Sequence, residues 1–265
     1  MTREVEKHRR KLYGRRKGPK LSAHQEQLLK TLLPQFALDL ESDRDPRTYF
    51  PGPVDDVWLE IGFGAGEHLL WQIDHHPHVG LIGAEPYVSG TAKLLSKLRT
   101  PTVALHAPPP PQTLEEKIDH APLSSSTRGG GAGEVGRGEI AKHIRLYSGD
   151  ARDIIEALPT ATLGRVFILF PDPWPKTRHH KRRFIQTDTL GALARTMKAG
   201  AELRFASDDA DYLNWTLERL AAHSAFEWTA TRAQDWQTRP DDWPQTRYEA
   251  KALHGVPAFL RFVKC

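Results

Sequence analysis

Short apolar runs and amphipathic stretches alternate along most of this chain, and this alternation limits the possible folds more than any other feature. Apolar runs with the length of β-strands lie at 57–61, 79–84, 144–147, 165–170 and 201–206. Stretches with helical periodicity follow them at 66–73, 88–98, 151–158, 184–197 and 211–223. Strands separated by helices pair in parallel through right-handed crossovers, with helices on both faces of the sheet. The pattern predicts a doubly wound, mostly parallel α/β fold.

The C-terminal region departs from this rhythm. Two further strands are expected, one at 226–230 and one at 259–263, with a long polar segment between them. Without an amphipathic helix as a crossover, they need not join the sheet in parallel. We therefore expect antiparallel pairing at this edge of the sheet.

Polar and low-complexity segments divide the chain into parts. We expect a flexible basic tail at 1–21, then a helix at 22–36 capped by Ser22 and a proline-punctuated linker at 39–53, with the main domain at 54–265. From about 101 to 140 the chain is rich in proline, glycine and serine. Such a composition buries too little apolar surface to offset the loss of chain entropy. We interpret it as a disordered insertion, since the strand–helix rhythm resumes after it.

Basic residues are unevenly placed, although the net charge is only +4. Residues 1–20 hold nine Lys or Arg and two Glu, and residues 176–183 read KTRHHKRR. Two basic clusters favour a polyanionic partner, because each neutralised phosphate releases counterions. A solubilising tail is the alternative for the first cluster.

Compartment is predicted from what the sequence lacks. The single cysteine, Cys265, excludes an intramolecular disulfide, which is typical of the reducing cytoplasm. The N-terminus has no apolar run of the kind found in secretory signals. No segment approaches the ~20 consecutive apolar residues of a membrane-spanning helix. We therefore expect a cytoplasmic protein that does not cross a membrane.

The sharpest local motif is WLEIGFGAG at 58–66, in which an apolar strand ends at Glu60 and runs into Gly62, Gly64 and Gly66. Glycines at such a turn allow the backbone to approach a ligand closely, at the sheet edge where α/β folds bind ligands. The G-x-G-x-G spacing differs from the dinucleotide G-x-G-x-x-G pattern. An acid at the strand end suits a cationic amino acid group better than a pyrophosphate. A plain strand–helix turn is the alternative.

Two more acids end the next two strands. Glu85 follows the second strand, near the offset expected for an acid that bonds ribose hydroxyls, and Asp150 follows the third. Helix N-capping explains either acid equally well. Acids at the ends of three successive strands nevertheless indicate one shared ligand site. Because a ribose acid also suits NAD, an NAD-dependent reductase remains an alternative.

The fourth strand runs into Pro-Asp-Pro-Trp-Pro-Lys at 171–176. Two prolines fix the backbone around Asp172, while Trp174 and Phe170 offer flat faces for a nucleobase. Lys176 and the basic run after it can hold phosphates. A rigid connection without function is the alternative. An acid, aromatic rings and basic side chains at this edge favour a catalytic site.

The segment FPDPWPKTRHHKRRFI resembles the signature of bacterial tRNA (guanine-N7-)-methyltransferases, and the glycine turn, ASDDADY and TRYEAKA resemble further motifs of that family. The resemblance implies a Rossmann-like S-adenosylmethionine (SAM)-methyltransferase fold of seven strands, the last antiparallel. It implies SAM as cofactor, tRNA as partner, and methylation of N7 of the variable-loop guanosine at position 46. The Pro/Gly-rich insertion departs from the family pattern.

The resemblance also implies residue roles. The cofactor-binding residues would be Glu60, Gly62, Gly64, Gly66, Glu85, Asp150 and Asp172, of which Asp172 would also be catalytic. The substrate-binding residues would be Lys176, Asp208, Thr246, Arg247, Tyr248 and Glu249. Other SAM-dependent RNA methyltransferases and a non-catalytic RNA-binding protein remain as alternatives, and so do a monomer and a homodimer.

Other signals have structural explanations. His75, His76 and His78 lie in one short segment without the spaced partners of zinc sites, so we expect no metal. The acidic run at 208–211 is expected to cap the helix that follows. For the late segment around Trp236 and Trp243, RNA contact and a packed lid are both open.

Overall fold

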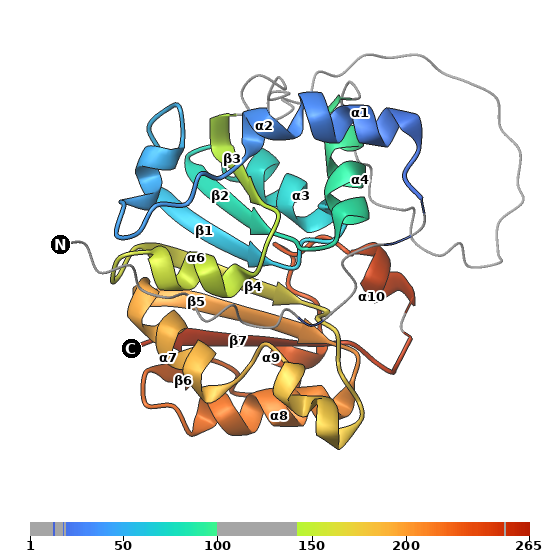
Figure 1. Cartoon of the computed structure of the whole chain (residues 1–265). Helices are drawn as coiled ribbons and strands as arrows, with labels where there is room; N and C mark the ends of the chain where they lie inside the picture. The colour runs from blue at the N-terminus through green and yellow to red at the C-terminus, as the bar shows by residue number, and fades with distance from the viewer. Residues whose placement is uncertain (1–12, 14–17, 19, 100–141, 252) are drawn as a thin grey trace, which may run out of the picture.

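The computed structural model describes residues 13, 18, 20–99, 142–251 and 253–265. The expected disordered insertion at 101–140 lies outside the described residues, and so does nearly all of the expected basic tail at 1–21. The remaining chain forms a twisted central sheet flanked by helices (Figure 1).

The described residues contribute seven strands to one sheet, in the order β3-β2-β1-β4-β5-β7-β6. Their bounds are β1 Asp56–Ile61, β2 Val79–Ala84, β3 Ile144–Tyr147, β4 Leu163–Leu169, β5 Met197–Ser207, β6 Phe226–Trp228 and β7 Ala258–Lys264. Strands β1 to β5 pair in parallel. The doubly wound, mostly parallel sheet predicted from the strand–helix rhythm is confirmed.

The predicted antiparallel edge is also confirmed, in a specific arrangement. Strand β7 lies between β5 and β6 and runs antiparallel to both. Only β7 is reversed, because β6 then points in the same direction as the parallel strands. The C-terminal strand β7 therefore lies between two neighbours, and β6 forms the outer edge of the sheet.

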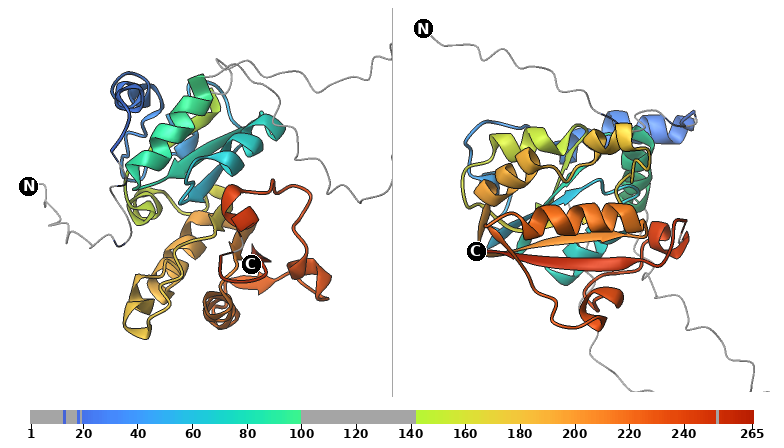
Figure 2. Two further views of the ribbon diagram at one scale, coloured as in Figure 1. Left: turned by 90° about the vertical axis from the view of Figure 1, so that its right-hand side faces the viewer. Right: turned by 90° about the horizontal axis from the view of Figure 1, so that it is seen from below.

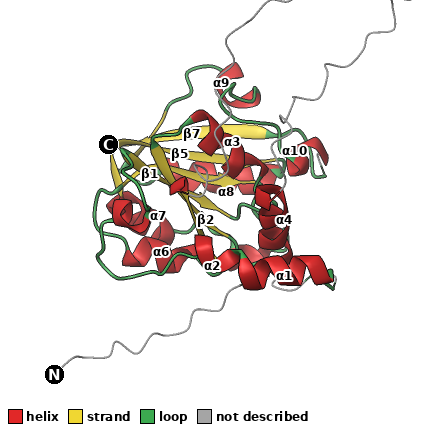
Figure 3. Ribbon diagram, turned by 90° about the horizontal axis from the view of Figure 1, so that it is seen from above, coloured by secondary structure: helices red, strands yellow, loops and turns green. Residues whose placement is uncertain are grey.

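Helices cover both faces of the sheet (Figure 3). One core cluster joins the sheet to α6 (Ala151–Ala157), α7 (Thr187–Thr196) and α8 (Ala210–Ala221). The opposite cluster joins it to α1 (Ala23–Thr31), α2 (Leu33–Phe36), α3 (Glu67–His75) and α4 (Val88–Arg99). Shorter helices are η1 (Pro46–Tyr49), η2 (Thr177–Arg182), α9 (Gln234–Gln237) and α10 (Arg247–Lys251).

The two clusters follow from side-chain alternation along the central strands. In β1, Val57 and Leu59 belong to the first cluster, whereas Trp58 belongs to the second, as the two-residue period of a strand requires. Strand β2 is buried along its whole length, which is typical of a parallel strand covered on both faces.

The N-terminal segment packs against the main sheet. Ser22 caps α1, and Gln25 completes a reciprocal capping box, as the sequence predicted for Ser22. The expected linker at 39–53 contributes the buried rings of Tyr49 and Phe50 to the first core cluster. Ala37 forms a parallel bridge with Leu146 in β3, which covers part of that edge of the sheet.

One helix begins later than its sequence pattern suggested. Residues 177–182 form the 3₁₀ helix η2, and α7 starts only at Thr187. Between them, the backbone N–H groups of Phe184 and Ile185 donate to the Tyr212 hydroxyl at 3.0 and 3.4 Å. Because a residue from α8 accepts these N–H groups, the segment stays extended instead of continuing a helix.

The carboxyl ends of the parallel strands meet at one edge of the sheet, on the right in Figure 1, where α10 also lies. Figure 2 (left) looks onto this edge. In open α/β sheets ligands bind at this edge.

Candidate active site

The glycine turn between β1 and α3 forms the centre of the edge. Gly62, Gly64 and Gly66 have φ angles of 79°, 56° and 73°, a region that costs other residues about 1–2 kcal/mol. A Cβ at Gly62 would meet nothing within 4 Å, whereas one at Gly64 would lie 3.2 Å from Cε2 of Tyr248. Backbone is therefore exposed to a ligand at Gly62 and lies against an aromatic ring at Gly64.

Glu85 ties this turn to the second strand. Its carboxylate accepts hydrogen bonds from the backbone N–H groups of Gly64 and Tyr87, each at 2.8 Å. Burial raises its pKa above the ordinary value, and the negative charges of Asp172 and Glu60 raise it further, against these two hydrogen bonds. The acids at the ends of β1, β2 and β4 are thus near enough to act on one another electrostatically, with Glu60 and Glu85 buried and Asp172 exposed.

Glu60 is buried beneath α3, with 3% of its surface exposed. Its Oε2 atom lies 2.9 Å from Nδ1 of His68, and Nε2 of His68 lies 3.1 Å from Nε2 of Gln72. The same Gln72 nitrogen donates to the carbonyl oxygen of Asp242 at 2.9 Å. The sequence reading missed His68 and Gln72. The two residues are four positions apart, a spacing that places side chains on one face of a helix, and this signal could have identified them.

Asp150 has the N-cap role that the sequence left open. Its carboxylate accepts from the backbone N–H of Arg152 at 3.0 Å and from the guanidinium of Arg152 at 2.5 to 3.0 Å. This places a carboxylate neutralised by Arg152 at the end of β3. Its contact with a cofactor remains a prediction.

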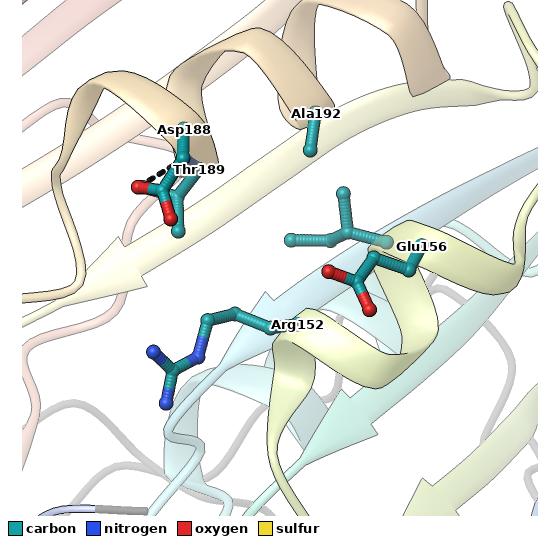
Figure 4. A pocket seen from close by; sticks show the side chains of 6 residues that line it. Arg152, Glu156, Asp188, Thr189 and Ala192 are labelled. Carbon is teal, nitrogen blue, oxygen red and sulfur yellow. Dashed lines mark hydrogen bonds between the residues drawn. The ribbon is translucent and has the colours of Figure 1, made fainter. Parts of the chain in front are cut away.

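A small pocket lies next to Arg152, between α6 and α7 (Figure 4). It is lined by Arg152, Ile155, Glu156, Asp188, Thr189 and Ala192. None of the acids at the ends of β1, β2 and β4 lines this pocket, which borders Asp150 only through Arg152.

The proline-rich turn after β4 has an unusual backbone. Phe170 and Trp174, which bracket Pro-Asp-Pro, have φ angles of 50° and 49°. Residues with a side chain adopt such angles mainly where the surroundings enforce them, often at functional sites. Asp172 is exposed between them. The turn therefore presents a carboxylate on a backbone held away from its relaxed conformation.

Arg183 binds this turn from the protein interior, which corrects the sequence-based prediction for this residue. The last arginine of the basic run was expected to bind phosphate, but only 2% of Arg183 is exposed. Its Nε donates to the carbonyl oxygen of Pro173 at 2.8 Å, and its Nη2 forms an ion pair with Asp211. Its guanidinium lies over the rings of Tyr212 and Trp215. Burial among these aromatic rings removes Arg183 from the surface.

Other cations of the basic run are accessible. Lys176 lies at the start of η2, and Lys176, Arg178 and Lys181 are exposed. Arg182 lies over the ring of Trp174, with its Cζ atom 4.8 Å from the ring centre. An aromatic ring bordered by exposed cations suits a stacked base and a phosphate backbone.

The C-terminal substrate candidates converge from α10. Tyr248 is 43% exposed and its ring faces Gly64, whereas Glu249 is buried and pairs with Nε of Arg239 at 2.9 Å. Burial raises the pKa of Glu249, and Arg239 lowers it. Thr246 accepts from the Glu249 N–H at 3.2 Å and so caps the helix.

The other two candidates lie at the borders of this group. Arg247 is exposed on α10, with its guanidinium near the ring of Tyr248. Asp208 accepts from the backbone N–H of His254 at 3.0 Å. The neighbouring Asp209 caps α8 through the N–H of Tyr212, which confirms the capping role expected of this acidic run.

The late segment is packed and not free. Trp243 is buried against Phe259, and Asp242 accepts from Arg204 at 2.7 Å. Arg204 is itself buried, with its guanidinium over Trp243. Of the two interpretations left open for Trp243, its burial favours packing; the role of a lid and RNA contact by the segment stay predictions. Arg204 and Asp242 gave no signal in the sequence, because their pairing depends on tertiary contacts.

Within the described ranges, no helix combines the length and the apolar character needed to cross a membrane. The same residues contain no group of three or more His, Cys, Asp or Glu side chains arranged to hold a metal ion.

This chain is similar in sequence to known methyltransferases. A family model described as "Putative methyltransferase" matches residues 55–258. A tRNA (guanine-N(7)-)-methyltransferase of Rhodospirillum rubrum is 45% identical over 95% of this chain and 87% of the relative. One of Azorhizobium caulinodans is 41% identical over 97% of this chain and 96% of the relative.

Among solved structures, the 16S rRNA methyltransferase KamB matches 80% of this chain and 89% of its own, with a TM-score of 0.47 and 13% identity. The assignment to a family rests on the sequence relatives and the family model. By both measures, the chain belongs to the family of tRNA (guanine-N(7)-)-methyltransferases.

Proposed function

We propose that this protein transfers a methyl group from SAM to N7 of guanosine 46 in the variable loop of tRNA. The observation that best supports the proposal is the glycine turn, where Glu85 accepts from the Gly64 N–H at 2.8 Å beside the exposed Gly62 backbone. Glu60 and Asp172 are near enough for their charges to raise the pKa of Glu85, and exposed cations lie in the basic run after β4. The names of the relatives at 41% and 45% identity support the tRNA substrate and the N7 target.

The residues at this edge fit SAM. The cofactor carries a sulfonium and an ammonium group, and the clustered carboxylates offer an excess of negative charge in a partly buried site. Open space at Gly62 leaves room for a ligand against the backbone. We assign Glu60 to the ammonium group, Glu85 to the ribose hydroxyls, and Asp150 to the adenine edge. Gly64 and Gly66 shape the turn.

The reaction requires no proton transfer by the protein. When bound, SAM supplies an electrophilic methyl group. Neutral guanine has a lone pair and no proton on N7, so no general base is required. The protein's contribution is positioning and electrostatic stabilisation. Asp172, fixed on its proline-rich turn, would stabilise the positive charge that develops on the purine, or orient the base through its N–H groups.

The remaining candidates surround the place for the base. Glu249 and Asp208 are carboxylates that can accept from guanine N–H groups, and Thr246 supports Glu249. Tyr248 offers an exposed ring beside the glycine turn. Lys176 and Arg247 would bind phosphates. We further propose that the protein acts in the cytoplasm, as a monomer or homodimer.

Asp172→Ala separates catalysis from cofactor binding. We expect the variant to lose turnover while its SAM affinity, measured by calorimetry, changes little. Lost SAM binding with unchanged turnover per bound cofactor would make Asp172 a cofactor ligand only.

The substrate is tested by transfer of labelled methyl from SAM to two unmodified tRNA transcripts, one natural and one with adenosine at position 46. We expect label on the first and none on the second. Label on both would refute the target, and label on neither, with SAM still bound, would refute tRNA as the substrate.

A further inference from the structure

A line of buried hydrogen bonds leads from Glu60 across one face of α3 to the late segment. It consists of Glu60, His68, Gln72 and the backbone carbonyl of Asp242, with successive distances of 2.9, 3.1 and 2.9 Å. The three side chains are 3%, 2% and 1% exposed. Water therefore competes little with the first two bonds, which strengthens them, whereas the third is part-buried.

The far end of the line fixes the proton on His68. The carbonyl oxygen of Asp242 can only accept, so it requires the amide nitrogen of Gln72 at that position. The second N–H of the same amide then faces Nε2 of His68. Nε2 must therefore accept, which leaves the proton of a neutral imidazole on Nδ1, 2.9 Å from the Glu60 carboxylate.

This arrangement favours one tautomer of His68 and orients the Glu60 carboxylate. An N–H group on Nε2 would point at the amide N–H of Gln72, which cannot accept a hydrogen bond. With its proton on Nδ1, the imidazole donates to Oε2 of Glu60 and holds the carboxylate in one orientation at the strand edge.

The line is anchored at both ends. Asp242 is held by Arg204 at 2.7 Å and by Arg165 at 3.8 Å, both from the sheet. The His68 ring packs edge-on against Phe167, with ring centres 4.5 Å apart. Neither His68 nor its partner amide can turn away without breaking these contacts.

We propose that His68 is a positioning residue for the cofactor: it orients the Glu60 carboxylate, and Gln72, which is bonded to the carbonyl oxygen of Asp242, fixes the tautomer of His68. The proposal rests on the assignment of Glu60 to the ammonium group of SAM. It predicts that cofactor affinity depends on a side chain that does not itself contact the cofactor.

The test measures SAM affinity of the full chain by calorimetry. We expect His68→Leu to weaken SAM binding about tenfold, the size of one hydrogen bond to a charged group. In a Glu60→Gln background the same substitution should have no further effect. His75→Leu, an exposed position on the same helix, is the matched control and should bind SAM like the wild type.

Two amide variants decide the case even if His68→Leu folds poorly. The amide nitrogen of His68→Asn takes the place of Nδ1 and can still donate to Glu60, whereas that of His68→Gln takes the place of Nε2. We expect Asn to retain most of the SAM affinity and Gln to lose it. Equal affinities of the two variants would overturn the proposal.

The outcomes also separate this proposal from the function it rests on. If Glu60→Gln binds SAM like the wild type, the cofactor role of Glu60 fails, and the proposal fails with it. If Glu60→Gln weakens binding but His68→Leu does not, or if the two effects simply add, only the proposal for His68 is refuted.

Discussion

Gly90, in the first turn of α4, is the position where the packing of the glycine turn can be tested most simply. A Cβ at Gly90 would lie 2.5 Å from the carbonyl oxygen of Gly64 and 3.3 Å from Cγ of Glu85. Carbon and oxygen do not approach that closely, and the nearest atom belongs to the backbone. Gly90→Ala must therefore displace either α4 or the turn whose N–H group binds Glu85.

The magnitude follows from two opposing effects. Alanine is preferred to glycine within a helix by up to about 1 kcal/mol, whereas overpacking of this kind costs about 1–3 kcal/mol. Gly191 in α7 supplies the control, because a Cβ there would meet nothing within 4 Å. Gly191→Ala should then gain stability, and Gly90→Ala should be less stable than it by about 1–3 kcal/mol.

Urea unfolding of the two variants measures this difference, and calorimetry measures their SAM affinity. We expect Gly90→Ala to bind SAM about tenfold more weakly, which corresponds to about 1.4 kcal/mol, and Gly191→Ala to bind it like the wild type. Equal stability of the two variants, together with unchanged SAM affinity, would refute the idea that α4 supports the glycine turn through this contact.

Because burial raises the pKa of Glu85 above 4.5, SAM affinity should fall on acidification with a midpoint above that value, and Glu85→Gln should abolish the pH dependence. In the cofactor-free protein, the folded state binds this proton more tightly than the unfolded chain does. The free energy of unfolding should therefore fall as the pH rises from 4.5 through the raised pKa of Glu85. Thermal melts at several pH values measure this fall. Arg183→Met should cost about 2 kcal/mol of stability and lower kcat, whereas Arg178→Met should raise KM for tRNA and flatten its salt dependence. Calorimetry should detect SAM binding and no NAD binding; NAD binding would revive the reductase alternative.

The fold was predictable from the sequence because its signals are local. Strand β2 is a continuous apolar run, and the glycine turn after β1 follows directly from its motif. The order of the last strands was not predictable in detail. Whether β7 pairs beside β5 or at the outer edge depends on contacts between segments far apart in the chain, and periodicity carries no information about them.

The candidate site also has residues that the sequence could predict and residues that it could not. Glu85 and Asp172 could be placed because each ends a parallel strand, and such ends meet at one edge. Arg183 was misread, because a basic run looks the same whether its last member faces solvent or lies buried beside Tyr212 and Trp215. His68 was missed, because its importance comes from a hydrogen-bonding partner on another element.

The position of the transferred methyl group on the base decides whether this protein methylates N7 of guanosine 46. Wild-type tRNA transcript methylated by this protein would be reduced and treated with aniline, which cleaves the chain at N7-methylguanosine. We predict a single cut at guanosine 46. A transcript that carries the label but resists cleavage would place the methyl group on another atom and refute N7 methylation.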